Sequence, residues 1–234
     1  MESEALTFVG RYQMNNGFSV HGGVRAQKLS GSIQTTQQLT ASSDYDFGFV
    51  VGAAYEIPDI ALRVAVTYTS EIDNELTGTE ITAGPVIAAT AFTVTTPENI
   101  NLEFQTGIAE DTLLFGSVRH VRWDGFNLTT PTLTYASFTG NTTTYALGVG
   151  RKFNENWSGA VSIGYEAAGV RPTTTALAPY TGQKSITLGG TYTQDSFKVT
   201  GGVTYAELGD TNLGAITWTG GKAVGVGLRL GYSF

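Results

Sequence analysis

The C-terminal segment from Val224 to Phe234 alternates strictly between apolar residues and small or polar residues. The apolar positions are Val224, Val226, Leu228, Leu230, Tyr232 and Phe234, and Gly225, Gly227, Arg229, Gly231 and Ser233 lie between them. A period of two residues predicts a β-strand with one apolar face. In a soluble β-sandwich that face meets a core, whereas in a transmembrane barrel it meets lipid and the opposite face lines a polar lumen.

The same alternation recurs along the whole chain, for example where Leu62, Val64 and Val66 alternate with Arg63 and Ala65. One candidate strand, 112–125, is ambiguous because Leu113-Leu114-Phe115 does not identify its apolar face. We predict about eleven strands in total, with boundaries good to a few residues. They are residues 5–13, 17–34, 45–56, 61–78, 99–109, 112–125, 142–153, 157–168, 183–193, 197–208 and 221–234.

Composition favours the membrane barrel over the soluble sandwich. Charged residues make up 14% of the chain, against about a quarter in ordinary soluble domains. No apolar run is long enough for a transmembrane helix, and no signal peptide is visible at Met1. The absence of cysteine excludes disulfides and thiolate metal sites, and the net charge of −7 argues against a nucleic-acid partner.

The connections between the predicted strands alternate in length. Short turns such as Asn154-Glu155-Asn156 and Asp195-Ser196 oppose long loops at about 35–44, 79–98, 126–141, 169–182 and 209–220. Short periplasmic turns opposite long external loops are typical of bacterial outer-membrane barrels. We therefore predict an all-β, antiparallel transmembrane β-barrel of outer-membrane type, forming one domain over residues 1–234. Because such barrels have even strand counts, we expect either missing N-terminal strands or a miscount by one.

Four segments carry motifs in a consistent order and spacing. Thr96-Pro97-Glu98 precedes Ile100-Asn101-Leu102, and the other segments are Thr112–Phe126, which ends in Trp123 and Phe126, Tyr145–Trp157 and Ile186–Tyr205. Together they resemble the FadL family of outer-membrane long-chain fatty-acid transporters over roughly residues 45–234. Asp124, Arg122 and His120 depart from the residues usual in that family.

The resemblance implies a barrel of about 14 strands plugged by an N-terminal hatch, of which this chain would supply about the last 11. It implies passive uptake of long-chain fatty acids or other hydrophobic small molecules across the bacterial outer membrane. No reaction and no cofactor are expected. The protein is expected to be a monomer in contact with outer-membrane lipid and lipopolysaccharide. Three alternatives stay open: a porin-like or purely structural barrel, a barrel enzyme, for which no Ser/His/Asp set is visible, and a soluble β-sandwich.

Charged residues on the polar face of the predicted strands are candidate lumen residues. They are Arg25, Arg63, Glu103, Arg119, Lys198 and Arg229, together with Glu166. An Arg or Lys within an apolar pocket could hold the head group of a carboxylate lipid. The alternative is a ladder of Arg–Glu pairs that stiffens the barrel.

Apolar residues in the predicted external loops are candidates for first capture of a ligand, since exposed apolar patches often mark binding surfaces. They are Ile81, Val86, Ile87, Phe92 and Val94, followed by Leu177 and Tyr180. Packing of loop against loop is the alternative. His21 and His120 show no metal-ligand spacing. The acidic stretch Asp73, Glu75 and Glu80 is either a calcium site or a solvated loop.

Overall fold

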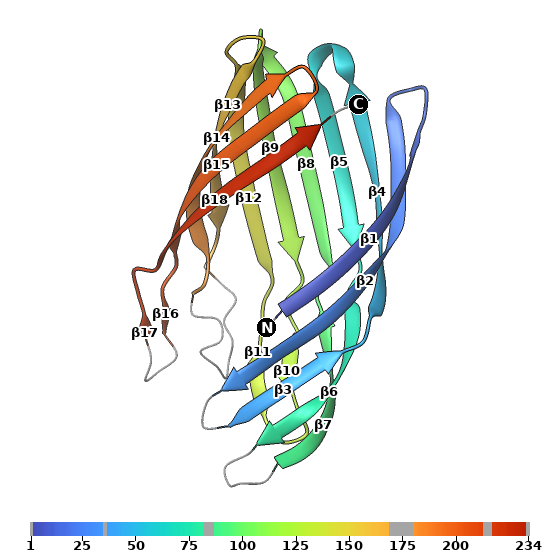
Figure 1. Ribbon diagram of the computed structural model, residues 1–234, viewed down its shortest axis with the longest axis vertical. Coiled ribbons are helices and arrows are strands. Elements are labelled where there is room, and N and C mark those ends of the chain that lie inside the picture. The colour runs from blue at the N-terminus through green and yellow to red at the C-terminus, as the bar shows by residue number, and fades with distance from the viewer. Residues whose placement is uncertain (1, 35–36, 82–86, 169–179, 213–216, 233–234) are drawn as a thin grey trace.

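The computed structural model describes residues 2–34, 37–81, 87–168, 180–212 and 217–232, and its main feature is one curved antiparallel sheet (Figure 1). Eleven long strands follow one another across this sheet in chain order, and we call them the wall. They are β1 (Glu2–Gln13), β2 (Phe18–Gln34), β4 (Asp46–Ile57), β5 (Leu62–Thr69), β8 (Asn99–Ala109), β9 (Thr112–Val121), β12 (Thr142–Lys152), β13 (Trp157–Glu166), β14 (Gln183–Gln194), β15 (Phe197–Leu208) and β18 (Lys222–Tyr232).

The predicted all-β antiparallel class is confirmed, and each of the predicted strand ranges overlaps a wall strand. β1 and β18 are the two edge strands of the wall and do not pair with each other among the described residues, so closure into a barrel stays a prediction. Among the described residues, no helix is long and apolar enough to cross a membrane. A short 3-10 helix, η1 (Pro58–Ile60), lies in the turn between β4 and β5.

The remaining strands gather at one end of the wall, the lower end in Figure 1. The second half of β2 pairs with β3 (Gln38–Ser43), β3 with β6 (Ile72–Ile81), and β6 with β7 (Ile87–Thr96). A hairpin of β10 (Asn127–Thr129) and β11 (Thr134–Ser137) completes what we call the cap, and β16 (Thr211–Asn212) with β17 (Thr217–Trp218) forms a separate hairpin. We call the opposite end, with its short turns, the turn end.

The cap corrects four sequence predictions, three loops and one strand. Residues expected in the loops 35–44, 79–98 and 126–141 contain β3, the end of β6 with β7, and β10 with β11. The predicted strand 61–78 is two strands, because Ser70 ends the pairing of β5 with β4. The N–H of Ser70 donates to the Phe49 carbonyl at 3.0 Å, and the Phe49 N–H donates to Ser70 Oγ at 2.9 Å. The chain then leaves the wall as β6.

The outer face of the wall is apolar and exposed. Phe8, Val24 and Phe49 form one row across β1, β2 and β4, and Phe8 has 78% of its surface exposed. At the other edge Val226 on β18 is 80% exposed. No second sheet covers this face in the part of the chain described, so the soluble sandwich does not fit. An apolar surface of this extent requires lipid or a partner.

The inner face of the wall carries small and polar residues, and the register settles the ambiguous strand β9. Leu114 pairs with Val149 and shares the outer face with Val118, which pairs with Tyr145. Leu113 and Phe115 therefore point to the inner face. The exposed apolar faces of the other wall strands agree with the alternation read from the sequence.

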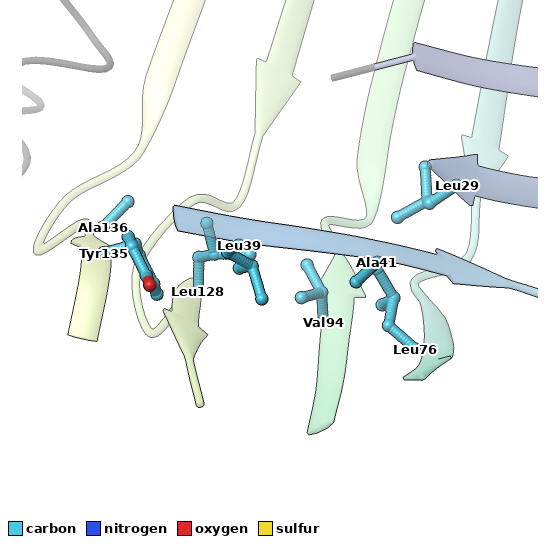
Figure 2. Packing of buried hydrophobic residues seen from close by; sticks show 8 residues of the cluster. All are labelled: Leu29, Leu39, Ala41, Leu76, Val94, Leu128, Tyr135 and Ala136. Atoms are coloured by element: carbon cyan, nitrogen blue, oxygen red, sulfur yellow. The ribbon is translucent and has the colours of Figure 1, made fainter. Parts of the chain in front are cut away.

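The buried apolar core of the molecule lies in the cap (Figure 2). It consists of Leu29, Leu39, Ala41, Leu76, Val94, Leu128, Tyr135 and Ala136, with Ile33, Phe92 and Phe126 packed against it. β2 runs through both regions. Its first half exposes Phe18, Val20 and Val24 on the outer face, and its second half buries Leu29 on the inner side.

Candidate functional site

A cavity of about 580 Å³ lies on the inner face where the wall meets the cap, and we call it the mouth cavity. Its apolar lining includes Leu29, Ile72, Val94, Val121, Trp123 and Phe126. Its charged lining consists of Arg25, Arg119, Glu2 and Glu166. Two of the six predicted head-group residues, Arg25 and Arg119, thus border the same space as the predicted capture residue Val94.

Strand geometry explains how one cavity is both charged and apolar. Arg25 and Leu29 lie on the same face of β2, separated by about 13 Å along the strand. Arg25 belongs to the wall and Leu29 to the cap core. Arg119 and Val121 are related in the same way at the end of β9. Each strand therefore brings a charge and an apolar side chain to the same side as it passes from the wall into the cap.

An aromatic cluster forms one rim of the mouth cavity. After β9 the chain turns at Gly125, whose φ of +87° lies in the left-handed region that favours glycine. Trp123, Phe126 and Phe138 then pack with ring centroids 5.3–5.4 Å apart. Trp123 and Phe126 belong to the family-like motif of the sequence, although residue chemistry alone did not mark them as cavity residues.

The two guanidinium groups of the mouth cavity make no ion pair with Glu2 or Glu166, the two acidic residues that line the same cavity. Within the described residues, neither Arg25 nor Arg119 has an ion-pair partner. Arg25 Nε is buried without a hydrogen-bond partner. Glu166 accepts a hydrogen bond from Thr144 Oγ1 at 2.6 Å. Buried polar atoms are normally paired, so the buried Nε of Arg25 is available to a hydrogen-bond acceptor from outside the chain.

Arg63 and Glu103, by contrast, belong to a network of ion pairs nearer the turn end. Glu56 Oε1 lies 2.8 Å from Arg11 Nη2 and 3.1 Å from Arg63 Nε, and Arg63 Nη1 lies 3.8 Å from Glu103 Oε2. These residues come from β1, β4, β5 and β8, so the network crosses the wall like the ladder considered for the lumen. Glu56 was missed from the sequence because it lies at the end of β4, beside a turn.

Lys198 and Arg229 lie on the inner face of neighbouring strands at the β18 edge, where Lys198 pairs with Gly231 and Arg229 with Thr200. Neither borders the mouth cavity. Val86 and Leu177 lie outside the described residues. Tyr180 is 44% exposed and does not line the mouth cavity either.

The described part of the predicted capture segment is not an exposed loop. Ile81 ends β6 and pairs with Ile87, which begins β7. Val94 is fully buried, and Phe92 is half-buried. Phe92 lines an apolar cavity of about 260 Å³ inside the cap, with Leu39, Leu76 and Leu128. Phe92 and Val94 point to the cap core because alternate residues of a strand share one face.

The acidic stretch does not form a metal site. Asp73 and Glu75 lie on the exposed face of β6, whereas Glu80 lies on its buried face. No group of three potential metal ligands gathers within the described ranges. His21 and His120 instead pair with Thr67 at 3.0 Å and Thr143 at 2.8 Å.

Glu80 is a carboxylate buried in the cap, only 1% exposed. Thr130 Oγ1, Thr132 Oγ1 and Tyr135 Oη donate hydrogen bonds to it and tie β6 to the β10–β11 hairpin. Burial alone would raise the pKa of Glu80, but the three donors hold it below its usual value. Burial and the bond to Glu80 raise the pKa of Tyr135 to about 12.

A curved antiparallel sheet with an apolar exposed face, a polar inner face and a cap at one end has the architecture of an outer-membrane barrel wall. Comparison with solved structures agrees. A FadL homologue of Pseudomonas aeruginosa matches with a TM-score of 0.73 at 15% identity, covering 97% of this chain and 65% of that one. The chain therefore spans about two thirds of that homologue's length. No protein-family model and no curated protein matched.

Two further matched structures are channels for hydrophobic compounds. The CymD monoaromatic hydrocarbon channel matches with a TM-score of 0.63 at 15% identity, covering 99% of this chain and 73% of that one. The Pseudomonas putida toluene transporter TodX matches with a TM-score of 0.57 at 11% identity, covering 87% and 63%. The fold resemblance predicted from the motifs is confirmed, and at these identities it is a resemblance of fold.

Proposed function

We propose that this chain forms the wall and outer cap of an outer-membrane channel for passive uptake of hydrophobic molecules, with long-chain fatty acids as the substrate class. The observation that carries this proposal is the mouth cavity, where apolar side chains share the lining with Arg119 and with Arg25, whose Nε is buried without a hydrogen-bond partner among the described residues. The matched channels are a monoaromatic hydrocarbon channel and a toluene transporter, which supports the broader class of hydrophobic molecules. The transport requires no chemical reaction and no cofactor.

A fatty acid fits the two kinds of surface in the mouth cavity. Its carboxylate would accept charge-assisted hydrogen bonds from Arg25 and Arg119, which are about twice as strong as neutral ones. Its acyl chain would contact Leu29, Val94 and Trp123. The volume of about 580 Å³ lies within the range typical of ligand pockets.

The cap would face the outside of the cell in this proposal, because long connections of bacterial barrels are external and short turns periplasmic. A ligand would first meet the apolar cap cavity beside Phe92 and then the mouth cavity bordered by Val94. Movement would be diffusion down a gradient. The apolar outer face of the wall would contact lipid and lipopolysaccharide.

Equilibrium binding of labelled oleate to the detergent-purified protein tests the head-group assignment. The double variant Arg25→Gln/Arg119→Gln should bind oleate about tenfold or more weakly, since one lost charge-assisted bond is worth roughly tenfold in affinity. Binding of oleyl alcohol, which has the same chain without the charge, should change less than twofold. Arg229→Gln, on the inner face but outside the cavity, should bind both ligands like the parent protein.

An equal loss for oleate and oleyl alcohol, or an equal loss in Arg229→Gln, would contradict the assignment. Membrane insertion is tested separately by electrophoresis with and without boiling. Folded membrane barrels migrate differently before and after heating, and a detergent-free soluble protein without that shift would rule out the membrane location. Uptake of labelled oleate by producing cells should exceed that of a matched strain without the protein.

A further inference from the structure

The lining of the mouth cavity carries as many acidic as basic side chains. Among the described residues its ionisable groups are Arg25, Arg119, Glu2 and Glu166. The formal charges of this lining therefore cancel. A fatty-acid carboxylate would use the two guanidinium groups and leave the two carboxylates without a counter-charge, so the acidic half of the cavity requires an explanation.

The strand register places Glu166 near Arg119 without joining the two. Thr144 on β12 pairs with Arg119 on β9 and, on its other side, with Glu166 on β13. Because neighbouring strands lie about 4.8 Å apart, the backbones at Arg119 and Glu166 are about 10 Å apart. The two charges therefore lie in one row of the inner face with a threonine between them.

Glu166 has no cation beside it in the part of the chain that the structure describes. It makes no ion pair there, and its hydrogen bond comes from the neutral hydroxyl of Thr144 at 2.6 Å. An ionised carboxylate that accepts one hydrogen bond keeps most of its acceptor sites. Glu166 is therefore open to a positive group that a ligand brings into the cavity.

Aromatic rings border the same cavity. Trp123 and Phe126 both line it, and their rings stand nearly perpendicular, at 78°, with centroids 5.4 Å apart. The faces of such rings attract quaternary ammonium groups through cation–π interactions. Guanidinium groups, in turn, match the geometry of phosphate and carboxylate. The lining thus combines groups that suit an anion with groups that suit a quaternary ammonium.

We propose that the mouth cavity binds single-chain amphiphiles whose head group carries a phosphate and a quaternary ammonium, as phosphocholine does. The phosphate would accept hydrogen bonds from Arg25 and Arg119. The ammonium would lie toward Glu166 and Trp123, and the chain would contact apolar side chains such as Leu29. This inference rests on the proposed function in one respect: the mouth cavity must be a binding site for amphiphiles.

The test uses two probes that differ in the ammonium group. Octylphosphocholine is a phosphodiester with a quaternary ammonium, and octyl methyl phosphate has the same chain and phosphodiester without it. Phosphorus NMR measures binding of each probe to the full chain at one fixed concentration of a non-ionic detergent. Each variant is compared with the parent protein for the same probe, so that partition of the probe into detergent cancels.

Glu166→Gln removes the charge and keeps an acceptor oxygen for Thr144. It should weaken binding of octylphosphocholine about fivefold, whereas octyl methyl phosphate should bind equally well or more tightly, because a repulsive charge is gone. Trp123→Leu should weaken octylphosphocholine about threefold more than octyl methyl phosphate. Glu103→Gln removes a carboxylate of the inner face outside the cavity and should leave both probes within twofold.

Equal changes for the two probes in Glu166→Gln would overturn the ammonium site, and so would the same loss of discrimination in Glu103→Gln. Electrophoresis without boiling establishes that each variant is folded. Oleate binding separates this result from the fate of the proposed function. If oleate depends on Arg25 and Arg119 while Glu166→Gln affects both probes alike, only the ammonium site fails.

The reverse outcome is equally clear. If octylphosphocholine binds the parent protein in a way that depends on Glu166 while oleate does not bind, the fatty-acid assignment fails and the ammonium site stands. If neither oleate nor either probe binds the parent protein, the proposed function and the ammonium site fail together.

Discussion

The wall and the cap use the same alternating pattern with opposite consequences. In the wall, apolar residues such as Phe8 and Val226 are largely exposed. In the cap, Leu76 and Val94 are buried in a core of ordinary kind (Figure 2). A strand pattern therefore identifies an apolar face, but not whether that face meets lipid or protein.

β2 contains both arrangements in one strand. Phe18, Val20 and Val24 occupy even-numbered positions on the outer face, whereas Leu29 and Ile33 occupy odd-numbered positions that pack on the cap core. A shift by one residue moves apolar side chains from one face of a strand to the other. Between Val24 and Leu29 the apolar side chains of β2 therefore change from the outer face to the side that packs on the cap core.

The largest effect that distinguishes the two regions is expected in the cap. Val94→Asp would place a carboxylate in a fully buried position, which costs about 4 kcal/mol when no partner is present. Ala91→Asp, on the exposed side of the same strand β7, should cost less than about 0.5 kcal/mol. Hydrogen exchange of the β6 and β7 amides measures both. Similar costs for the two variants would show that the cap has no protein-like core.

In the wall we expect a smaller effect and the reverse order: the exposed position should tolerate a charge less well than the inner one. Leu188→Arg places a charge on the exposed outer face of β14, which should cost about 2–4 kcal/mol near the middle of a membrane. Thr187→Arg, on the inner face, should cost only about 1 kcal/mol, because it loses one hydrogen bond, to Thr204. Urea unfolding from lipid vesicles gives both values. If Leu188→Arg cost less stability than Thr187→Arg, the outer face would not contact lipid.

The wall was predictable from the sequence because each strand carries its own alternation and pairs with the next wall strand. The cap was not, because β3 pairs with β6 across the intervening β4 and β5, and the apolar residues of β2 change phase before Leu29. The cavity was predictable only in part. Alternation placed Arg25 on the inner face, whereas the face of Arg119 follows from the register of β9, and their convergence depends on the arrangement that brings β2 and β9 to one space.

The smallest of these effects concerns the polar group inside the cap core. Glu80→Gln keeps one acceptor oxygen for the three hydroxyl donors but loses their charge-assisted bonds, at a cost of about 1–2 kcal/mol. Glu75→Gln, on the exposed face of the same strand, should be nearly neutral. Limited proteolysis of the cap in the two variants gives the comparison.

The pH dependence of the stability difference between the parent protein and Glu80→Gln tests whether Glu80 is charged in the cap core. Because the pKa of Glu80 is lowered in the folded protein, its stabilising contribution is complete above the usual glutamate pKa and is lost as pH falls through the lower folded value. The stability gap between the parent protein and Glu80→Gln should therefore be largest near neutral pH and shrink on acidification. A gap that stays constant from neutral to acidic pH would mean that the buried carboxylate is not charged. The cap core would then hold a neutral carboxylic acid at Glu80. The three hydroxyl groups would stabilise that acid no more than they stabilise the amide in Glu80→Gln.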